Sequence, residues 1–135
     1  MAALSSCLIG MVKIALKNKK KNMRFLHTFT MDRFIREFCI VRFGLPRQCG
    51  NSTAMTRAAK FLNRKYNVKR LYPNDDMNNL DGGHGTVRYY GFLYPAIYMI
   101  DCATTIGERR INTFIEKCII AKIAEHPNFL IVLVQ

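Results

Sequence analysis

Three short segments of the chain are almost entirely apolar, and they constrain the fold more than any other feature. They are Phe38–Gly44 (FCIVRFG), Pro95–Cys102 (PAIYMIDC) and Asn128–Val134 (NFLIVLV). None approaches the roughly 18 to 20 apolar residues that a membrane-spanning helix needs. Their short length and their β-branched and aromatic side chains predict buried strands instead.

Amphipathic helix patterns lie between these strands. The clearest covers Gly107–His126, where apolar residues recur at i, i+3, i+4 and i+7 until Pro127 ends the pattern. A second pattern covers Asn51–Tyr66, and a short helix-prone segment covers Met31–Glu37. With Asn67–Tyr72 as a further candidate strand, strands and helices alternate. This alternation predicts a three-layer α/β fold with a mostly parallel sheet.

The sequence predicts one small domain preceded by a basic extension. Of the 135 residues half are hydrophobic, which is enough for a core. We place the domain over residues 31–135 and the extension, a loosely packed helix and basic linker, over residues 1–30. Because the extension lacks acids, it also fits an organellar targeting segment, a nucleic-acid-binding arm, or residues upstream of a translation start at Met23 or Met31.

Positive charge is concentrated in the first half of the chain. Up to Arg70 there are 16 lysines and arginines against two acids, whereas from Leu71 onward five basic residues face seven acidic ones. This imbalance favours a polyanionic partner, such as nucleic acid, nucleotide phosphates or an anionic membrane surface, over plain solvated faces. The candidate nucleic-acid-binding residues are Lys17, Lys19, Lys20, Lys21, Arg24, Arg57, Arg64, Lys65, Lys69 and Arg70.

The five cysteines are scattered, and no two of them form a C-x-x-C pair. The odd number and the spacing argue against a disulfide framework or a zinc site. We therefore expect a reducing, intracellular setting. For a viral protein this is the host cytoplasm, and for a chain with a targeting segment it is an organelle matrix.

The stretch CIVRFGLPRQCGNSTAMTRAAKFLNRKY has the layout of a phosphate-binding loop, with a strand, a turn and a helix. Such a loop needs a small residue at the turn, a helix N-terminus facing the anion, and a lysine followed by serine or threonine. Gly50 meets the first need. The strict pattern G-x-x-x-x-G-K-[ST] fails twice, since Gly44 lies one residue too early and Asn51 replaces the lysine.

The segment LPRQCGNST resembles the variant phosphate loops of viral DNA-packaging ATPases (the terminase large subunits) and of related helicase-like ATPases. Those loops often have the sequence R-Q-x-G-K-[ST] without the leading glycine. Asn51 departs from that pattern. The matching residues are Arg47, Gln48, Gly50, Ser52 and Thr53.

A second segment, AIYMIDCA, resembles the second motif of these ATPases. Asp101 matches the magnesium-associated acid, whereas Cys102 stands where these families usually carry the catalytic glutamate. Glu108, seven residues past Asp101, is a candidate substitute base. The resemblance spans about residues 38–135, mostly as a pattern of apolar segments.

This resemblance implies a P-loop-like topology with ATP and Mg²⁺ as cofactors. Arg47, Gln48, Gly50, Asn51, Ser52 and Thr53 would contact phosphates. Ser52 and Asp101 would hold Mg²⁺, and Asp101 and Glu108 would be the catalytic residues. Because the lysine and the glutamate are missing, it implies a nucleotide-binding, nucleic-acid-associated protein more strongly than an efficient ATPase.

Two alternatives remain open from the sequence. The segment PRQCGNST is also compatible with a proline turn followed by a serine or asparagine helix cap, which needs no ligand. The whole chain is compatible with a non-enzymatic basic protein that binds nucleic acid or docks in a larger assembly, such as a ribonucleoprotein or an organellar complex.

Overall fold

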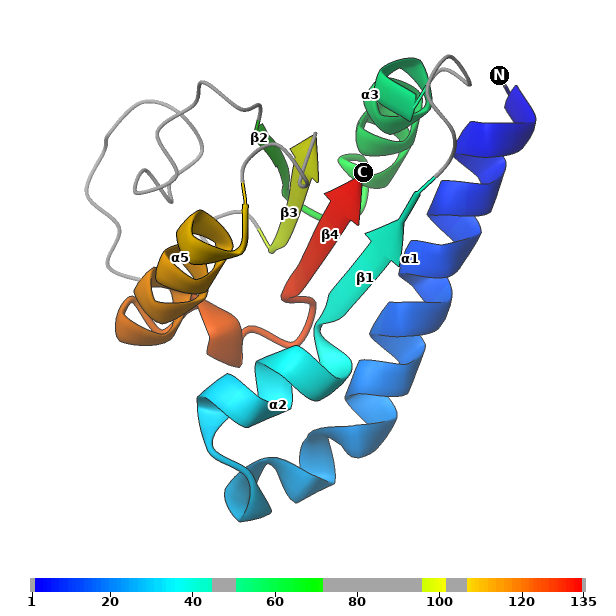
Figure 1. Ribbon diagram of the computed structural model, residues 1–135. Coiled ribbons are helices and arrows are strands. Elements are labelled where there is room, and N and C mark those ends of the chain that lie inside the picture. Colours follow the sequence, from blue (N-terminus) through cyan, green and yellow to red (C-terminus); the bar gives the residue numbers. More distant parts are fainter. Residues whose placement is uncertain (1, 45–50, 72–95, 102–106, 135) are drawn as a thin grey trace.

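The computed structural model describes residues 2–44, 51–71, 96–101 and 107–134, and Figure 1 shows their arrangement. Every strand and helix that the sequence predicts in these ranges is present. The elements, in chain order, are α1 (Ala2–Asn22), the 3₁₀ helix η1 (Met23–Thr28), α2 (Met31–Phe38), β1 (Ile40–Phe43), α3 (Asn51–Leu62), β2 (Val68–Leu71), β3 (Ile97–Asp101), α5 (Glu108–Ile120), the 3₁₀ helix η3 (Ile123–Glu125) and β4 (Leu130–Val134).

The four described strands form one sheet in the order β1-β4-β3-β2, and every neighbouring pair is parallel. Helices α1 and α3 pack on one face, and helices α2 and α5 pack on the other (Figure 1). The prediction of an α/β fold with a parallel sheet is therefore confirmed. The arrangement is compatible with the expected three layers.

The core is split by the sheet into two clusters. Because successive strand residues point to opposite faces, Tyr98 and Ile100 pack toward α2 and α5, whereas Ile97 and Met99 pack toward α1 and α3. Every residue of β3 and β4 is buried. Helices on both faces explain why these strands are apolar throughout instead of alternating.

Helix α5 is shorter than the sequence pattern predicted. It begins after Gly107, whose φ of 88° suits glycine, and it ends at Ile120 instead of reaching His126. Lys122 adopts a left-handed conformation with a φ of 61°, which stops the helix before Pro127. The pattern failed here because apolar spacing continues through residues that form a turn and a 3₁₀ helix.

Helix α1 is part of the core and not a loosely packed extension. Leu8, Val12 and Leu16 are buried, and they contact the cluster that α3 and the sheet form. Their i, i+4, i+8 spacing places them on one stripe of the helix. The structure thus gives residues 2–22 a packing role that their lysine-rich composition did not predict.

The side chain of Lys19 connects α1 to the segment that leads into β4. It is completely buried, and its Nζ donates hydrogen bonds to the carbonyl oxygens of His126 at 2.7 Å and Phe129 at 3.0 Å. The ammonium also lies 5.5 Å from the centre of the Phe129 ring. Burial lowers the pKa of Lys19 from 10.5 to about 8.

We predict that Lys19→Met destabilises the protein by about 1–3 kcal/mol at pH 7, because the carbonyl oxygens of His126 and Phe129 lose the ammonium as a donor while the stem of the side chain is kept. The exposed neighbour Lys20 provides the control, since Lys20→Met is expected to change stability by less than about 0.5 kcal/mol. Urea denaturation measures both. Equal stability of the Lys19→Met variant and the wild type would show that the desolvation of the ammonium outweighs its hydrogen bonds.

The buried ammonium also predicts a pH dependence. Between pH 8 and 10.5 the unfolded chain holds a proton on Lys19 that the folded chain does not, so the free energy of unfolding rises with pH in this window. Burial raises the pKa of Cys39 to about 11 and of Cys118 to about 12, which has the opposite effect above about pH 9. The Lys19→Met variant retains both thiols, so its comparison with the wild type reports mainly on Lys19.

The stability of the wild type relative to Lys19→Met should therefore increase as the pH rises through this window. Denaturation of both proteins at several pH values measures this difference. A constant difference would contradict the assigned pKa of Lys19.

Candidate functional site

The predicted phosphate loop lies mainly outside the described residues, which exclude Arg47, Gln48 and Gly50. Asn51 and Ser52 are the first residues of α3, at the end of the connection from β1. Thr53 follows them and is exposed. The helix that a phosphate loop requires therefore starts at the predicted residue.

Asp101 and the last residue of β1 lie at the same edge of the sheet. Phe43 is in register with Val134 of the central strand, and Val134 is in register with Asp101. The three residues thus form one row at the carboxyl ends of β1, β4 and β3 (Figure 1). One strand separates β1 from β3, which corresponds to about 10 Å between their axes.

The carboxylate of Asp101 belongs to the α3 side of the sheet. It follows Ile97 and Met99 in the period-two alternation of β3, and both of these residues pack against the cluster that contains Met55 of α3. Asp101 itself is only 5% exposed. A buried acid therefore ends β3 on the same side of the sheet as the helix that follows the loop.

Arg70 brings a positive charge to this side as well. It lies beside Met99 in the register of β2 and β3, and its Nη1 donates a hydrogen bond to Oγ1 of Thr56 at 2.8 Å. From the sequence, Arg70 is predicted to be a surface residue that binds nucleic acid, and no role is predicted for Thr56. Both residues could have been found from periodicity. Arg70 is two residues from the apolar Val68, and Thr56 is three residues before the buried Ala59.

Glu108, the candidate substitute base, is not brought together with Asp101. Its Oε1 lies 3.7 Å from Nη2 of Arg42, and both side chains are more than half exposed. Arg42 is in register with Leu133, which packs toward α2 and α5. Glu108 therefore pairs on one side of the sheet while Asp101 faces the other. Such an exposed ion pair contributes little to stability.

Most of the candidate nucleic-acid-binding residues lie on or just after α1 and α3. Lys69 is in register with Tyr98, which packs toward α2 and α5, so Lys69 lies on the other side of the sheet. Lys19 is buried and its ammonium is engaged, so it presents no charge to a partner. The sequences of α1 and α3 contain no aspartate or glutamate, whereas α2 and α5 each mix both signs. The exposed candidates on or just after α1 and α3 are Lys17, Lys20, Lys21, Arg24, Arg57, Arg64 and Lys65.

The described residues contain no group of three or more histidine, cysteine, aspartate or glutamate side chains that could hold a metal ion. Among them there is also no helix of the length and apolarity needed to cross a membrane.

No model of a known protein family, no curated protein and no solved structure matches this chain.

We predict that Thr56→Val lowers stability by about 1 kcal/mol, because the change keeps the shape of the side chain but removes the oxygen that accepts from Arg70. Thr113→Val on α5 is the control, since the hydroxyl of Thr113 is exposed and bonds only within its own helix. Chemical denaturation of the two variants measures the difference. Equal effects would mean that the Arg70–Thr56 contact contributes nothing beyond the loss of a hydroxyl.

Proposed function

We propose that the protein binds the phosphates of a nucleoside triphosphate, with Mg²⁺, where β1 leads into α3. The observation that carries the proposal is the row of Phe43, Val134 and Asp101 at the carboxyl edge of the sheet. Ligands of parallel α/β sheets bind beyond this edge. The proposal includes a P-loop-like topology for the connection between β1 and α3.

The spacing of the row suits a chelated polyphosphate. One strand separates the start of the loop from Asp101, and a triphosphate with its metal ion has a comparable length. Mg²⁺ is usually held by one or two carboxylates together with substrate phosphates, so it needs no cluster of protein ligands. Asp101 supplies a suitable oxygen, and Ser52 would add a hydroxyl.

The charges favour binding over rapid hydrolysis. Asn51 offers a neutral hydrogen bond where a phosphate loop normally has an ammonium. Arg70 lies on the correct side of the sheet and would compensate in part, together with Arg47 from the loop. Glu108 does not replace the catalytic glutamate, because it pairs with Arg42 on the opposite side.

The test is thermal stabilisation by ATP and Mg²⁺. We predict that the melting temperature rises with ATP–Mg²⁺, since a ligand at 100 times its Kd adds about 2.7 kcal/mol of stability. The rise should shrink when EDTA removes the metal, and it should vanish in Gly50→Val, because the added side chain blocks the backbone approach to phosphate. Gly10→Ala is the glycine control: a Cβ there meets no atom within 4 Å.

The proposal fails if millimolar ATP–Mg²⁺ does not stabilise the wild type. It also fails if Gly50→Val keeps the full shift, because the nucleotide would then bind elsewhere.

A second candidate function is the binding of nucleic acid without catalysis, alone or within a larger assembly. It is favoured by a specific observation, namely that α1 and α3 pack side by side and that neither contains an acidic residue. Phosphate contacts of this kind release counterions, so the affinity would fall steeply with salt. Binding that persists in Gly50→Val separates this function from the nucleotide site.

A further inference from the structure

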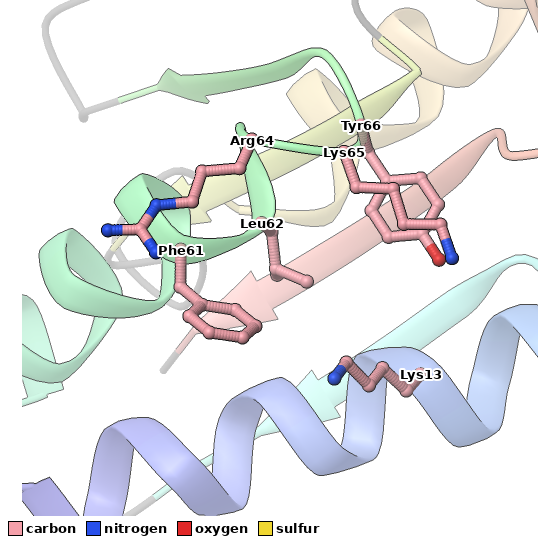
Figure 2. A pocket seen from close by; sticks show the side chains of 6 residues that line it. All are labelled: Lys13, Phe61, Leu62, Arg64, Lys65 and Tyr66. Atoms are coloured by element: carbon pink, nitrogen blue, oxygen red, sulfur yellow. The ribbon is translucent and has the colours of Figure 1, made fainter.

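A small hollow lies between α1 and the end of α3, away from the candidate nucleotide site. Its volume is about 240 Å³, and Figure 2 shows how its side chains surround it. Helix α3 has 12 residues, so this end lies roughly 18 Å from the N-terminus of the helix. The lining residues are Lys13, Phe61, Leu62, Arg64, Lys65 and Tyr66.

The hollow combines exposed aromatic rings with cations. Phe61 is 44% exposed, so part of its side chain is open to solvent. The Nζ of Lys13 lies 5.1 Å from the centre of the Phe61 ring, and the guanidinium carbon of Arg64 lies 5.9 Å from it. Lys65 lies in the same way over Tyr66, at 5.6 Å.

We infer that this hollow is a contact site for single-stranded nucleic acid. A base would stack on Phe61 while backbone phosphates pair with Lys13, Arg64 and Lys65. Rings that stack on bases, combined with cations that follow the backbone, are the usual means of binding single strands without sequence preference. The inference rests on the nucleic-acid association proposed above and is independent of the nucleotide site.

Binding would exchange cation–π contacts of Phe61 for base stacking and phosphate contacts. In the free protein, the cations near the Phe61 ring contribute about 0.5–1 kcal/mol each, as is typical of exposed cation–π pairs. A base stacked on an aromatic side chain contributes about 1–3 kcal/mol. A cation displaced from the ring does not lose its role, because it lies within reach of the phosphates that arrive with the base.

The charge around the hollow is also complementary to a polyanion. Both helices that form it lack acidic residues, so no carboxylate from α1 or α3 competes with phosphate for these cations. The segment that follows α3, residues 63–67, adds two cations and no acid. A duplex would not use Phe61, since its bases are already stacked on one another.

The test is fluorescence anisotropy of the full chain with a labelled thymidine oligonucleotide of about 12 nucleotides, a length within the range of single-strand sites. We predict that Phe61→Leu weakens binding about tenfold, because leucine keeps apolar area but has no ring face. Phe61→Tyr should bind within about twofold of the wild type. Ile120→Ala, at a 77% exposed position on α5, should not change binding.

Three further measurements sharpen the test. Binding of a duplex of equal length should be unaffected by Phe61→Leu. Arg64→Gln should reduce the salt dependence of single-strand binding by about one phosphate contact, a change of about 0.7 in the logarithmic slope. Melting temperatures of the variants verify that Phe61→Leu remains folded, as expected for a partly exposed side chain.

The inference is overturned if Phe61→Leu binds the single strand as the wild type does, or if single strand and duplex weaken together. It is also overturned if oligonucleotide binding does not depend on Phe61 whereas binding to vesicles of phosphatidylserine and phosphatidylcholine does. The hollow would then contact membranes. No binding of any oligonucleotide by the wild type would contradict the proposed nucleic-acid association itself.

Discussion

β4 is one of the two interior strands of the sheet and the last strand described in the chain. The rest of the fold depends on its pairing. β4 joins β1 on one side to β3 on the other, and all five of its residues are fully buried. β1 therefore has no partner among the described strands until residues 130–134 are in place. Bringing such distant segments together costs loop-closure entropy before any pairing rewards it. The same pairing creates the row that holds Asp101 level with the end of β1.

The segment that leads into β4 is held by Lys19 of the N-terminal helix α1. Lys19 binds the carbonyl oxygens of His126 and Phe129, and the backbone N–H of Asn128 donates to Nδ1 of the same His126 at 3.0 Å. Nδ1 can accept this bond only without a proton. Burial and the charges of Lys19 and Lys20 lower the pKa of His126, which favours the neutral ring. One buried ammonium thus satisfies two carbonyl groups and favours the protonation state that the turn requires.

The sequence predicted the helices and strands better than it predicted how they pair and pack. Apolar runs and helical spacing located the strands and the start of α3, because they record which faces are buried. The strand order is set by long-range pairing and leaves no local pattern. Lys19 looked equivalent to its lysine neighbours, yet it continues the buried stripe of Leu8, Val12 and Leu16 at i+3, which is the one signal of its burial. Arg70 was grouped with surface residues by its charge, whereas its half-buried side chain also bonds Thr56 of α3.

Helix α3 contributes residues to both proposed sites. Its first residues end the connection from β1, and its last residues carry the hollow around Phe61. Between them it is anchored by buried Met55 and Leu62 and by the Arg70–Thr56 contact. Packed cores deform little, so the distance between the two sites is fixed by the length of the helix. Coupling between the two proposed sites would therefore displace α3 as a unit against α1 and the sheet.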